Sequence, residues 1–421
     1  MQLLLAVATS EFWPNNPMRR LIQRVSPAAA PPLPSLLLVA AVGVLLVLAA
    51  HRSSFFDTTS AWSGARRPSR ARNSTTAGGR VPKGCDLFRG EWVPDGGGGG
   101  APYYTNRSCP HIQEHQNCLK YGRPDRGFLR WRWRPAGCDL PRFDAAAFLR
   151  SFRGRSLAFV GDSLARNHMQ SLMCLLSKVE YPKDISKTPH SEFSTMLYES
   201  HNFTMAIFWS PFLVKANKSG DQWHLHLDEP DDAWLAGIPG FDYVVLSAAN
   251  WFTRPSMFIE AGRVVGCHIC LVPGVADLTL RYSQRMALRT ALRALTGVFN
   301  GTVVLRTLSP TSHFEGGEWD KGGDCRRTRP YAANETRMAG LDLDMHTVQV
   351  EEFARAKVAA AARMVLMDTT AAMLLRPDGH PSRYGHWANQ NVTLYNDCVH
   401  WCLPGPIDVW NEMLFQILLP D

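Results

Sequence analysis

The first 84 residues of this sequence contain no cysteine, and the chain has no internal repeat. A repeat architecture is therefore not expected. The sequence also has no nucleic-acid reader motif. Many of the arginines behind its net charge of +8 lie in the first 80 residues, for example in residues 66–72. A basic chain can bind nucleic acid, an anionic membrane or an acidic substrate, but without a reader motif we do not expect nucleic-acid binding.

One stretch is apolar enough to suggest a membrane span. Residues 33–50 carry no charge, and a spanning helix needs roughly 17–25 residues. Arg19, Arg20 and Arg24 precede this stretch, which favours a cytoplasmic N-terminus and a luminal C-terminus. A cleaved signal peptide is the alternative, because Leu48-Ala49-Ala50 offers small residues for cleavage. We favour a retained signal-anchor, with a cytosolic tail at 1–32, the transmembrane segment at 33–50 and a flexible luminal stem at 51–83.

Ten cysteines and seven glycosylation sequons indicate an oxidising, secretory compartment. Cys267 and Cys270 resemble half a zinc site, but no second pair follows at ligand spacing, so we expect disulfides and no metal. The pairing of the cysteines cannot be deduced from the sequence. The cysteines are at positions 85, 109, 118, 138, 174, 267, 270, 325, 398 and 402, and the sequon asparagines are Asn73, Asn106, Asn202, Asn217, Asn300, Asn334 and Asn391.

The chain beyond the stem divides into two parts. Residues 84–138 have little helical periodicity and four of the cysteines, and they predict a small loop-rich unit held by disulfides. From residue 139 to 421, β-branched apolar runs alternate with helical stretches, which predicts an α/β fold with a parallel sheet and helices on both faces. The expected strands are 157–160, 243–246, 302–305 and 364–367, and the expected helices are 164–176, 286–299 and 345–362.

Gly161, Asp162 and Ser163 lie where a buried strand should pass into a helix. Gly161 permits a tight turn there, and the N–H groups after Ser163 would be unpaired at the helix start and available to an oxyanion. Ligands of such sheets bind at the carboxyl ends of the strands. Ordinary helix capping by Asp162 or Ser163 would produce the same tripeptide.

Asp397 and His400 supply the partners that a serine nucleophile needs. A carboxylate three residues before an imidazole can accept from Nδ1, which leaves Nε2 to take the proton of Ser163. The flanking Cys398 and Cys402 could fix this loop through disulfides. The alternative is an aspartate that caps a turn beside an uninvolved histidine.

Three further residues are candidates for oxyanion or substrate contacts. Asn250 follows the expected strand 243–246 and could donate its amide to an oxyanion. Arg166 and Asn167 lie one turn past Ser163 and could contact substrate. A loop or supporting role explains each of them equally well.

Two further features, a pair of tryptophans and one histidine, have structural interpretations. Trp131 and Trp133 alternate and would share one strand face, where indoles could stack on sugars, although core packing is the commoner role. His380 lies in the loop 376–381, and we interpret it as structural.

These motifs together resemble the plant trichome-birefringence-like proteins, which are Golgi polysaccharide O-acetyltransferases related to the SGNH/GDSL esterases. The resemblance covers roughly residues 84–421. The segments 208–214 and 402–412 are most similar to the xyloglucan-acting branch. The segment Ala249-Asn250-Trp251 departs from the Gly-His or Gly-Gln pair expected before that tryptophan in the branch. The motifs that carry the resemblance are residues 85–93, 104–109, 116–118, 122–125, 131–133, 161–163 and 397–405.

The resemblance implies a Ser163–His400–Asp397 triad, double displacement through an acetyl-serine, and a single-pass type II protein of the Golgi membrane. It also implies a hemicellulose acceptor, namely xyloglucan, acetylated at a 6-hydroxyl of side-chain galactose or backbone glucose. Mannan or another hemicellulose is the alternative acceptor. No bound cofactor is expected. Acetyl-CoA is the default donor, although no CoA-binding motif is visible, and the oligomeric state is left open.

Two other functions remain compatible with the sequence. An acetyl-esterase would use the same triad with water as the acceptor. A noncatalytic wall-polysaccharide binding protein would use the tryptophans and not the triad.

Overall fold

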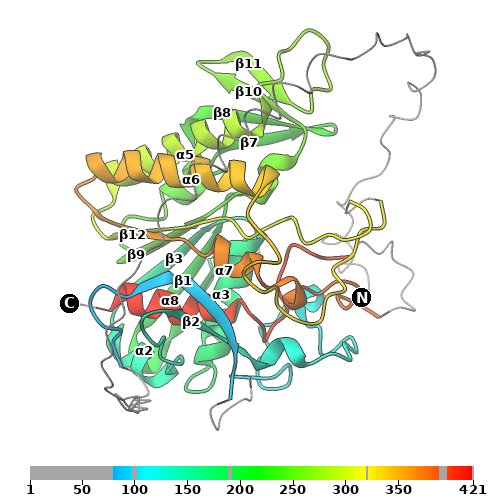
Figure 1. Ribbon diagram of the computed structural model, residues 1–421. Coiled ribbons are helices and arrows are strands. Elements are labelled where there is room, and N and C mark those ends of the chain that lie inside the picture. Colours follow the sequence, from blue (N-terminus) through cyan, green and yellow to red (C-terminus); the bar gives the residue numbers. More distant parts are fainter. Residues whose placement is uncertain (1–78, 97–101, 188–191, 319–320, 388–395, 420–421) are drawn as a thin grey trace, which may run out of the picture. The chain divides into compact units, whose positions relative to one another are not determined.

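A seven-stranded mixed sheet lies at the centre of the described part of the chain (Figure 1). The computed structural model describes residues 79–96, 102–187, 192–318, 321–387 and 396–419. None of the helices in these residues is long and apolar enough to span a membrane. The predicted anchor at 33–50, the tail before it, and the sequons at Asn73 and Asn391 lie outside them.

The strand order of this sheet is β13-β12-β9-β3-β6-β5-β4, and its first five strands are parallel. The predicted strands are confirmed within one residue at each end, and two antiparallel edge strands extend the sheet beyond β6. The bounds are β3 (Ser156–Gly161), β4 (Lys183–Asp184), β5 (Phe193–Tyr198), β6 (Phe203–Trp209), β9 (Tyr243–Ser247), β12 (Thr302–Arg306) and β13 (Arg363–Met367).

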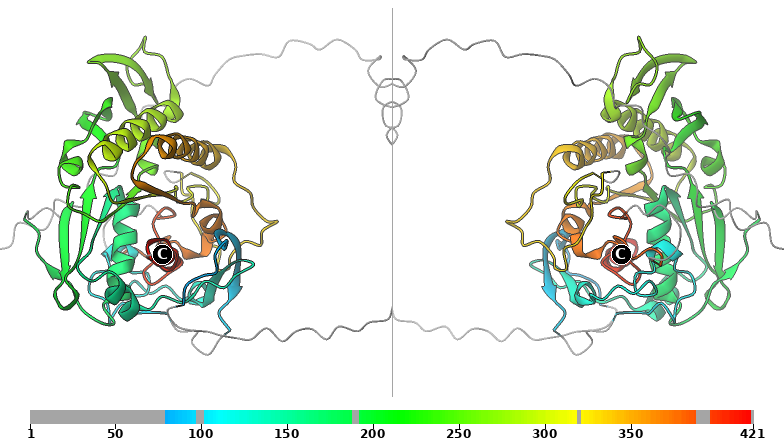
Figure 2. Two further views of the ribbon diagram at one scale, coloured as in Figure 1. Left: turned by 90° about the vertical axis from the view of Figure 1, so that its left-hand side faces the viewer. Right: turned by 90° about the vertical axis from the view of Figure 1, so that its right-hand side faces the viewer.

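Helices cover both faces of the sheet, as the sequence predicts. Alternate residues of β3 point to opposite sides: Leu157 and Phe159 pack with α2, α3 and α8, whereas Ala158 and Val160 pack with α5 and α6. In the two side views, α5 and α6 lie across the sheet from α8 (Figure 2). The helices are α2 (Ala145–Ser151), α3 (Ser163–Leu176), α4 (Asp232–Leu235), α5 (Thr279–Val298), α6 (Gly340–Ala359), α7 (Thr370–Leu374) and α8 (Asp408–Leu418).

A second, four-stranded sheet was not predicted. Its order is β11-β10-β8-β7, and it is formed by segments that follow β6 and β9. β7 and β8 are rich in polar residues, and much of β7 and β11 is exposed, so the hydrophobic pattern that reveals a buried strand is weak in these three strands. The bounds are β7 (Val214–Ser219), β8 (Gln222–Pro230), β10 (Ser256–Glu260) and β11 (Arg263–His268).

The N-terminal part of the described chain forms an antiparallel hairpin that joins the main core. In this hairpin, β1 (Asp86–Pro94) pairs with β2 (Trp131–Ala136), and Trp92 lies opposite Trp133. Trp133 is 2% exposed and packs in the same cluster as α3 and α8. Its indole N–H donates to the carbonyl of Leu87 at 2.8 Å. Core packing, and not sugar stacking, is therefore the role of Trp133.

All ten cysteines form disulfides, which confirms the prediction of an oxidised framework. The bond between Cys267 and Cys270 excludes the alternative of half a zinc site at this pair. Two of the bonds hold the loop that carries His400. The pairs are Cys85–Cys138, Cys109–Cys174, Cys118–Cys402, Cys267–Cys270 and Cys325–Cys398.

Two acidic side chains of α8 are buried beneath the hairpin. The hydroxyl of Tyr104 donates to Asp408 at 2.7 Å, and the hydroxyl of Tyr103 donates to Glu412. Burial raises the pKa of Asp408 to about 6 and that of Glu412 to about 7. Both carboxyls therefore hold protons in the folded state at pH values where an unfolded chain would release them.

We predict that Glu412→Gln removes a pH-dependent loss of stability. The folded-state pKa of about 7 lies above the ordinary value of 4.5, so Glu412 contributes fully at low pH, and its contribution falls as pH rises toward 7. The wild type should lose on the order of 3 kcal/mol across this window relative to the glutamine variant. Denaturant unfolding at pH 5 and pH 8 measures the difference. Exposed Glu318→Gln is the control, and parallel pH curves for wild type and Glu412→Gln would contradict the prediction.

Candidate active site

The turn from β3 to α3 requires glycine at its first position. Gly161 has a φ of +149°, and a Cβ there would lie 1.8 Å from the carbonyl oxygen of Ser247 on β9. No other residue fits this close approach of two backbones. Gly161 therefore has the turn-forming role predicted for it, and Ser163 begins α3 directly at the carboxyl end of a central strand.

Asp162 caps α3 and ties it to the neighbouring strand. Its carboxylate accepts from the N–H of Leu164 at 3.0 Å and from the N–H of Ala249, just after β9, at 3.2 Å. Burial raises the pKa of Asp162, while the guanidinium of Arg306, itself buried in β12, opposes that rise. The capping function expected of this motif is thus assigned to Asp162, which leaves the hydroxyl of Ser163 free for another partner.

Ser163, His400 and Asp397 form one continuous hydrogen-bonded series. Nδ1 of His400 lies 2.8 Å from Oδ2 of Asp397, and Nε2 lies 2.7 Å from Oγ of Ser163. Because the carboxylate can only accept, Nδ1 carries the proton and Nε2 accepts from the serine. The other oxygen of Asp397 accepts from the N–H groups of Val399 and His400 at 3.0 and 2.9 Å. The structure thus unites three residues that span 237 positions of the chain.

The electrostatics of this series favour a proton-accepting imidazole beside a fixed anion. Burial lowers the pKa of His400, but the negative charge of Asp397 and the hydrogen bond to it outweigh burial and raise that pKa above its ordinary value. Burial raises the pKa of Asp397, yet its interactions with His400 hold it far below the usual range. Asp397 is therefore ionised in the neutral pH range, and His400 is a stronger base than a free histidine.

Asn167 supports this loop from α3. It is fully buried, its side-chain oxygen accepts from the N–H of Trp401 at 2.9 Å, and its amide donates to Gln116 at 2.9 Å. These bonds occupy the groups through which Asn167 would have met a substrate. The predicted substrate contact of Asn167 is therefore wrong, because the amide is committed to the backbone beside His400.

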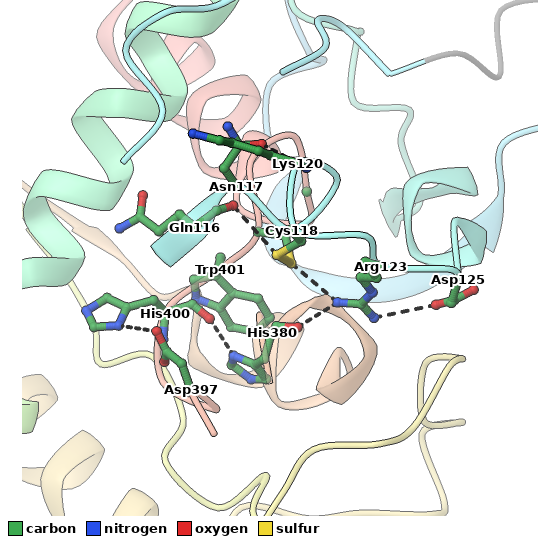
Figure 3. Close-up of a disulfide and its surroundings, with 12 residues drawn as sticks. Gln116, Asn117, Cys118, Lys120, Arg123, Asp125, His380, Asp397, His400 and Trp401 are labelled. Atoms are coloured by element: carbon green, nitrogen blue, oxygen red, sulfur yellow. Dashed lines mark hydrogen bonds and ion pairs between the residues drawn. A yellow bond between two sulfur atoms is a disulfide. The ribbon is translucent and has the colours of Figure 1, made fainter. Parts of the chain in front are cut away.

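His380 supports the same loop from the other side (Figure 3). Its Nδ1 lies 2.7 Å from the carbonyl oxygen of His400, and its ring stacks on Trp401 with centroids 4.1 Å apart. Its Nε2 contacts Nδ1 of the buried His313 at 2.6 Å. Arg123 donates to the carbonyl of His380 at 2.6 Å. His380 is thus part of the scaffold behind His400, in agreement with its structural interpretation.

The donors available to an oxyanion differ from those expected. The N–H of Leu164 is used by the side chain of Asp162, and those of Ala165 and Arg166 donate to its carbonyl. Only the N–H of Ser163 itself, among the first N–H groups of α3, has no acceptor in the described residues. Both side-chain polar atoms of Asn250 are buried and without a hydrogen-bond partner in the described chain. The expected row of free N–H groups after Ser163 is therefore wrong, whereas the amide of Asn250 is unengaged.

Several residues near the triad carried no individual signal in the sequence. The ring of His115 lies 5.1 Å from that of His400, edge to face, and Trp209 and Trp251 lie 5.3 Å from each other. Cζ of Arg166 lies 4.8 Å from the ring centroid of Trp209. Arg166 was already a substrate-contact candidate in the sequence, whereas His115, Trp209 and Trp251 are revealed only by the fold, because each belongs to a different element.

Two groups of side chains in the described residues could in principle hold a metal ion, and the bonds they form favour neither. His115, Asp397 and His400 place one ligand atom each within 4.8 Å of one another, but both ring nitrogens of His400 are engaged by Asp397 and Ser163. In the other such group, Cys325 and Cys398 are joined in a disulfide.

Five sequon asparagines lie in the described chain. Asn106 is half-buried, and Asn202, Asn217, Asn300 and Asn334 are exposed.

A serine just after a central parallel strand, bonded to a His–Asp pair from a C-terminal loop, is an arrangement that α/β enzymes use for acyl transfer. Residues 140–417 match the GDSL/SGNH-like acyl-esterase family found in Pmr5 and Cas1p, and residues 83–139 match the PMR5 N-terminal domain. The chain belongs to this family.

Curated relatives support the same conclusion. Protein trichome birefringence-like 19 of Arabidopsis thaliana is 52% identical over 348 residues, which cover 79% of this chain and 80% of that protein. Xyloglucan O-acetyltransferase 3 of Populus trichocarpa is 44% identical over 345 residues, which cover 79% of this chain and 85% of that protein. Xyloglucan O-acetyltransferase 1 of Arabidopsis thaliana is 44% identical over 342 residues, with 79% and 80% coverage. The resemblance found in the sequence is therefore confirmed.

We predict that the pH dependence of activity reports His400. The base form of His400 is needed, so kcat/KM should rise with pH through an inflection above 6.5. Asp397→Asn removes the charge that raises this pKa, so the inflection should shift to lower pH and kcat should fall about 10³- to 10⁴-fold. Initial rates measured between pH 5 and 9 test both effects. The exposed Asp139→Asn should leave the profile in place, and an unshifted inflection in Asp397→Asn would contradict the assignment.

We predict that the Cys118–Cys402 disulfide supports both stability and turnover. It joins positions 284 apart, whereas Cys267–Cys270 joins positions only 3 apart. Cys118→Ser with Cys402→Ser should cost about 2–5 kcal/mol of unfolding free energy and lower kcat. Cys267→Ser with Cys270→Ser, the matched control, should cost less in both. Denaturant titrations and rates would reject the prediction if the two double variants retained equal turnover.

Proposed function

We propose that this chain is a polysaccharide O-acetyltransferase that transfers an acetyl group to a hemicellulose through an acetyl-Ser163 intermediate. The observation that carries the proposal is the hydrogen-bonded series Ser163–His400–Asp397. Membership in an acyl-esterase family, and relatives named xyloglucan O-acetyltransferase, support the reaction class.

In the first half-reaction, Oγ of Ser163 attacks the carbonyl carbon of the acetyl donor. Nε2 of His400 takes the hydroxyl proton, and Asp397 stabilises the imidazolium that forms. Collapse of the tetrahedral intermediate breaks the bond from the acetyl carbon to the donor's leaving atom, which receives the proton from His400. The product is an ester between Ser163 and acetate.

In the second half-reaction, a sugar hydroxyl takes the place of the departed leaving group. His400 accepts the proton of this hydroxyl as its oxygen attacks the acetyl-serine. The bond to Oγ breaks, Ser163 regains its proton from His400, and the acetyl group leaves on the sugar. The same imidazole therefore acts first as a base and then as an acid in each half-reaction.

The developing oxyanion needs donors already in place. The N–H of Ser163 and the side-chain amide of Asn250 are suited to this role, because neither has a partner in the described residues. Related xyloglucan-acting proteins are expected to carry another side chain at the position of Asn250. The oxyanion role of Asn250 is therefore proposed for this chain from its own geometry.

The acceptor proposed is xyloglucan, at a 6-hydroxyl of side-chain galactose or backbone glucose, with acetyl-CoA as the default donor. Mannan or another hemicellulose is the nearest alternative acceptor. We further propose a type II protein of the Golgi membrane with a luminal catalytic part. Five disulfides and four exposed sequon asparagines are suited to such a lumen.

We predict net acetyl transfer from donor to sugar by the full chain. Incubation with isotope-labelled acetyl-CoA and xyloglucan oligosaccharides should give acetylated sugar, identified by mass spectrometry, and Ser163→Ala should lower the rate by at least about 10³-fold. Parallel reactions with mannan oligosaccharides test the acceptor. Labelled free acetate without acetylated sugar would indicate an acetyl-esterase. Undiminished activity in Ser163→Ala would refute the triad mechanism.

A further inference from the structure

The two strands that flank β3 each place a tryptophan beside the nucleophile. Trp209 is the last residue of β6 and lies in register with Gly161, which also pairs with Ser247 at the end of β9. Trp251 lies in the 3₁₀ helix η4 (Asn250–Thr253), just after β9. Since Ser163 follows β3 directly, both indoles lie at the same edge of the sheet as the nucleophile.

The two indoles form part of an aromatic group that is only half-buried. Their centroids are 5.3 Å apart and their planes are at 85°, and Trp223 lies 5.5 Å from Trp251. All three side chains retain some exposure to solvent. An indole that is only partly covered presents apolar surface on which the CH face of a sugar ring can pack.

The indole N–H groups distinguish this group from the tryptophans of the core. Within the described chain, the N–H groups of Trp209, Trp223 and Trp251 have no acceptor, and they are not among the buried atoms left without one. By contrast, the N–H of Trp92 donates to the carbonyl of Ala372 at 2.7 Å, and that of Trp401 donates to Ser309 at 2.9 Å. The first group therefore has donors open to an outside partner.

Two guanidinium groups lie over the same rings. Cζ of Arg166 is 4.8 Å from the centroid of Trp209, and Cζ of Arg254 is 3.4 Å from that of Trp251. A guanidinium held against an aromatic ring keeps donors in its own plane that can meet hydroxyl oxygens. Nε of Arg166 is buried without a partner in the described residues.

We propose that Trp209 and Trp251, with Arg166, bind the sugar rings of a neutral acceptor glycan and so bring its hydroxyl to Ser163. This inference rests on the proposed transferase function and adds where the acceptor is held. Apolar ring faces pack on the indoles, and hydroxyls accept from the guanidinium and indole N–H groups. The surface replaces Trp131 and Trp133 as the sugar-contacting tryptophans.

Binding is measured without turnover in the full chain carrying Ser163→Ala. Neutral xyloglucan oligosaccharide is titrated by isothermal calorimetry, with the indole fluorescence as a second readout. Adding Trp251→Ala or Trp209→Ala should weaken the affinity about tenfold, and the corresponding Trp→Phe variants should weaken it less. Trp131→Phe is the matched control, because Trp131 is also half-buried but packs against the hairpin core; it should leave the affinity unchanged. Thermal unfolding identifies any variant that fails to fold, and the phenylalanine variants then provide the comparison.

Steady-state rates separate this inference from the proposed function. In chains with Ser163 intact, Trp251→Phe should raise the KM for the acceptor by a larger factor than it lowers kcat. Acetyl transfer by the wild type together with wild-type acceptor affinity in both tryptophan variants would overturn the inference alone. Oligosaccharide binding that depends on Trp251 in a chain that transfers no acetyl would support the inference and overturn the transferase. Preference for oligogalacturonate over the neutral oligosaccharide would overturn the neutral acceptor.

Discussion

The attachment of the C-terminal loop to the start of α3 is the constraint on which the site depends. Disulfides hold the loop at Cys398 and Cys402, and the backbone of Asp397 forms a two-way bridge with Ser382 at 2.8 and 2.9 Å. Asn167 and His380 hold the backbone on either side of His400. Ordering a flexible loop costs roughly 1–2 kcal/mol per residue in conformational entropy. The covalent and hydrogen-bonded attachments remove most of that cost before any substrate arrives, so the imidazole is already aligned with Ser163.

The same sheet edge supplies several separate components of one chemical site. β3 leads to the nucleophile, β9 leads to Asn250 and Trp251, and β6 ends at Trp209. Burial raises the pKa of Asp162, and the charge of the buried Arg306 at the end of β12 opposes this rise. Arg306 thus helps to keep the capping carboxylate charged. Parallel strands end at one edge, so residues far apart in the chain converge without any long-range sequence signal. In this arrangement the N–H of Ser163, the amide of Asn250 and the indoles of Trp209 and Trp251 all lie at the edge of the sheet that carries the nucleophile.

Sequence reasoning succeeded where local patterning and burial agree. The strands around Phe159, Val245 and Val304 are apolar on both sides because helices cover both faces, so their pattern was plain. It failed for the four-stranded sheet, in which the largely exposed strands β7 and β11 are recognised only by their partners. It also failed at Asn167, where one polar residue type serves equally well for substrate binding and for a backbone clamp. The expectation of free N–H groups after Ser163 was wrong, because Asp162 caps the helix more completely than the motif alone can indicate.

The sequence by itself determined the chemistry that is available: a serine after a glycine turn, an Asp–His pair three residues apart, an oxidised cysteine set and membership in an acyl-esterase family. These features are local in the chain or recur as motifs, so composition and spacing reveal them. Only the tertiary structure decided which cysteines pair, that Asn167 supports Trp401, and that the indoles of Trp209 and Trp251 meet beside Ser163. Each of these depends on a distance between segments far apart in the sequence, which is set by the packing of the sheet and helices and not by any local preference of the backbone.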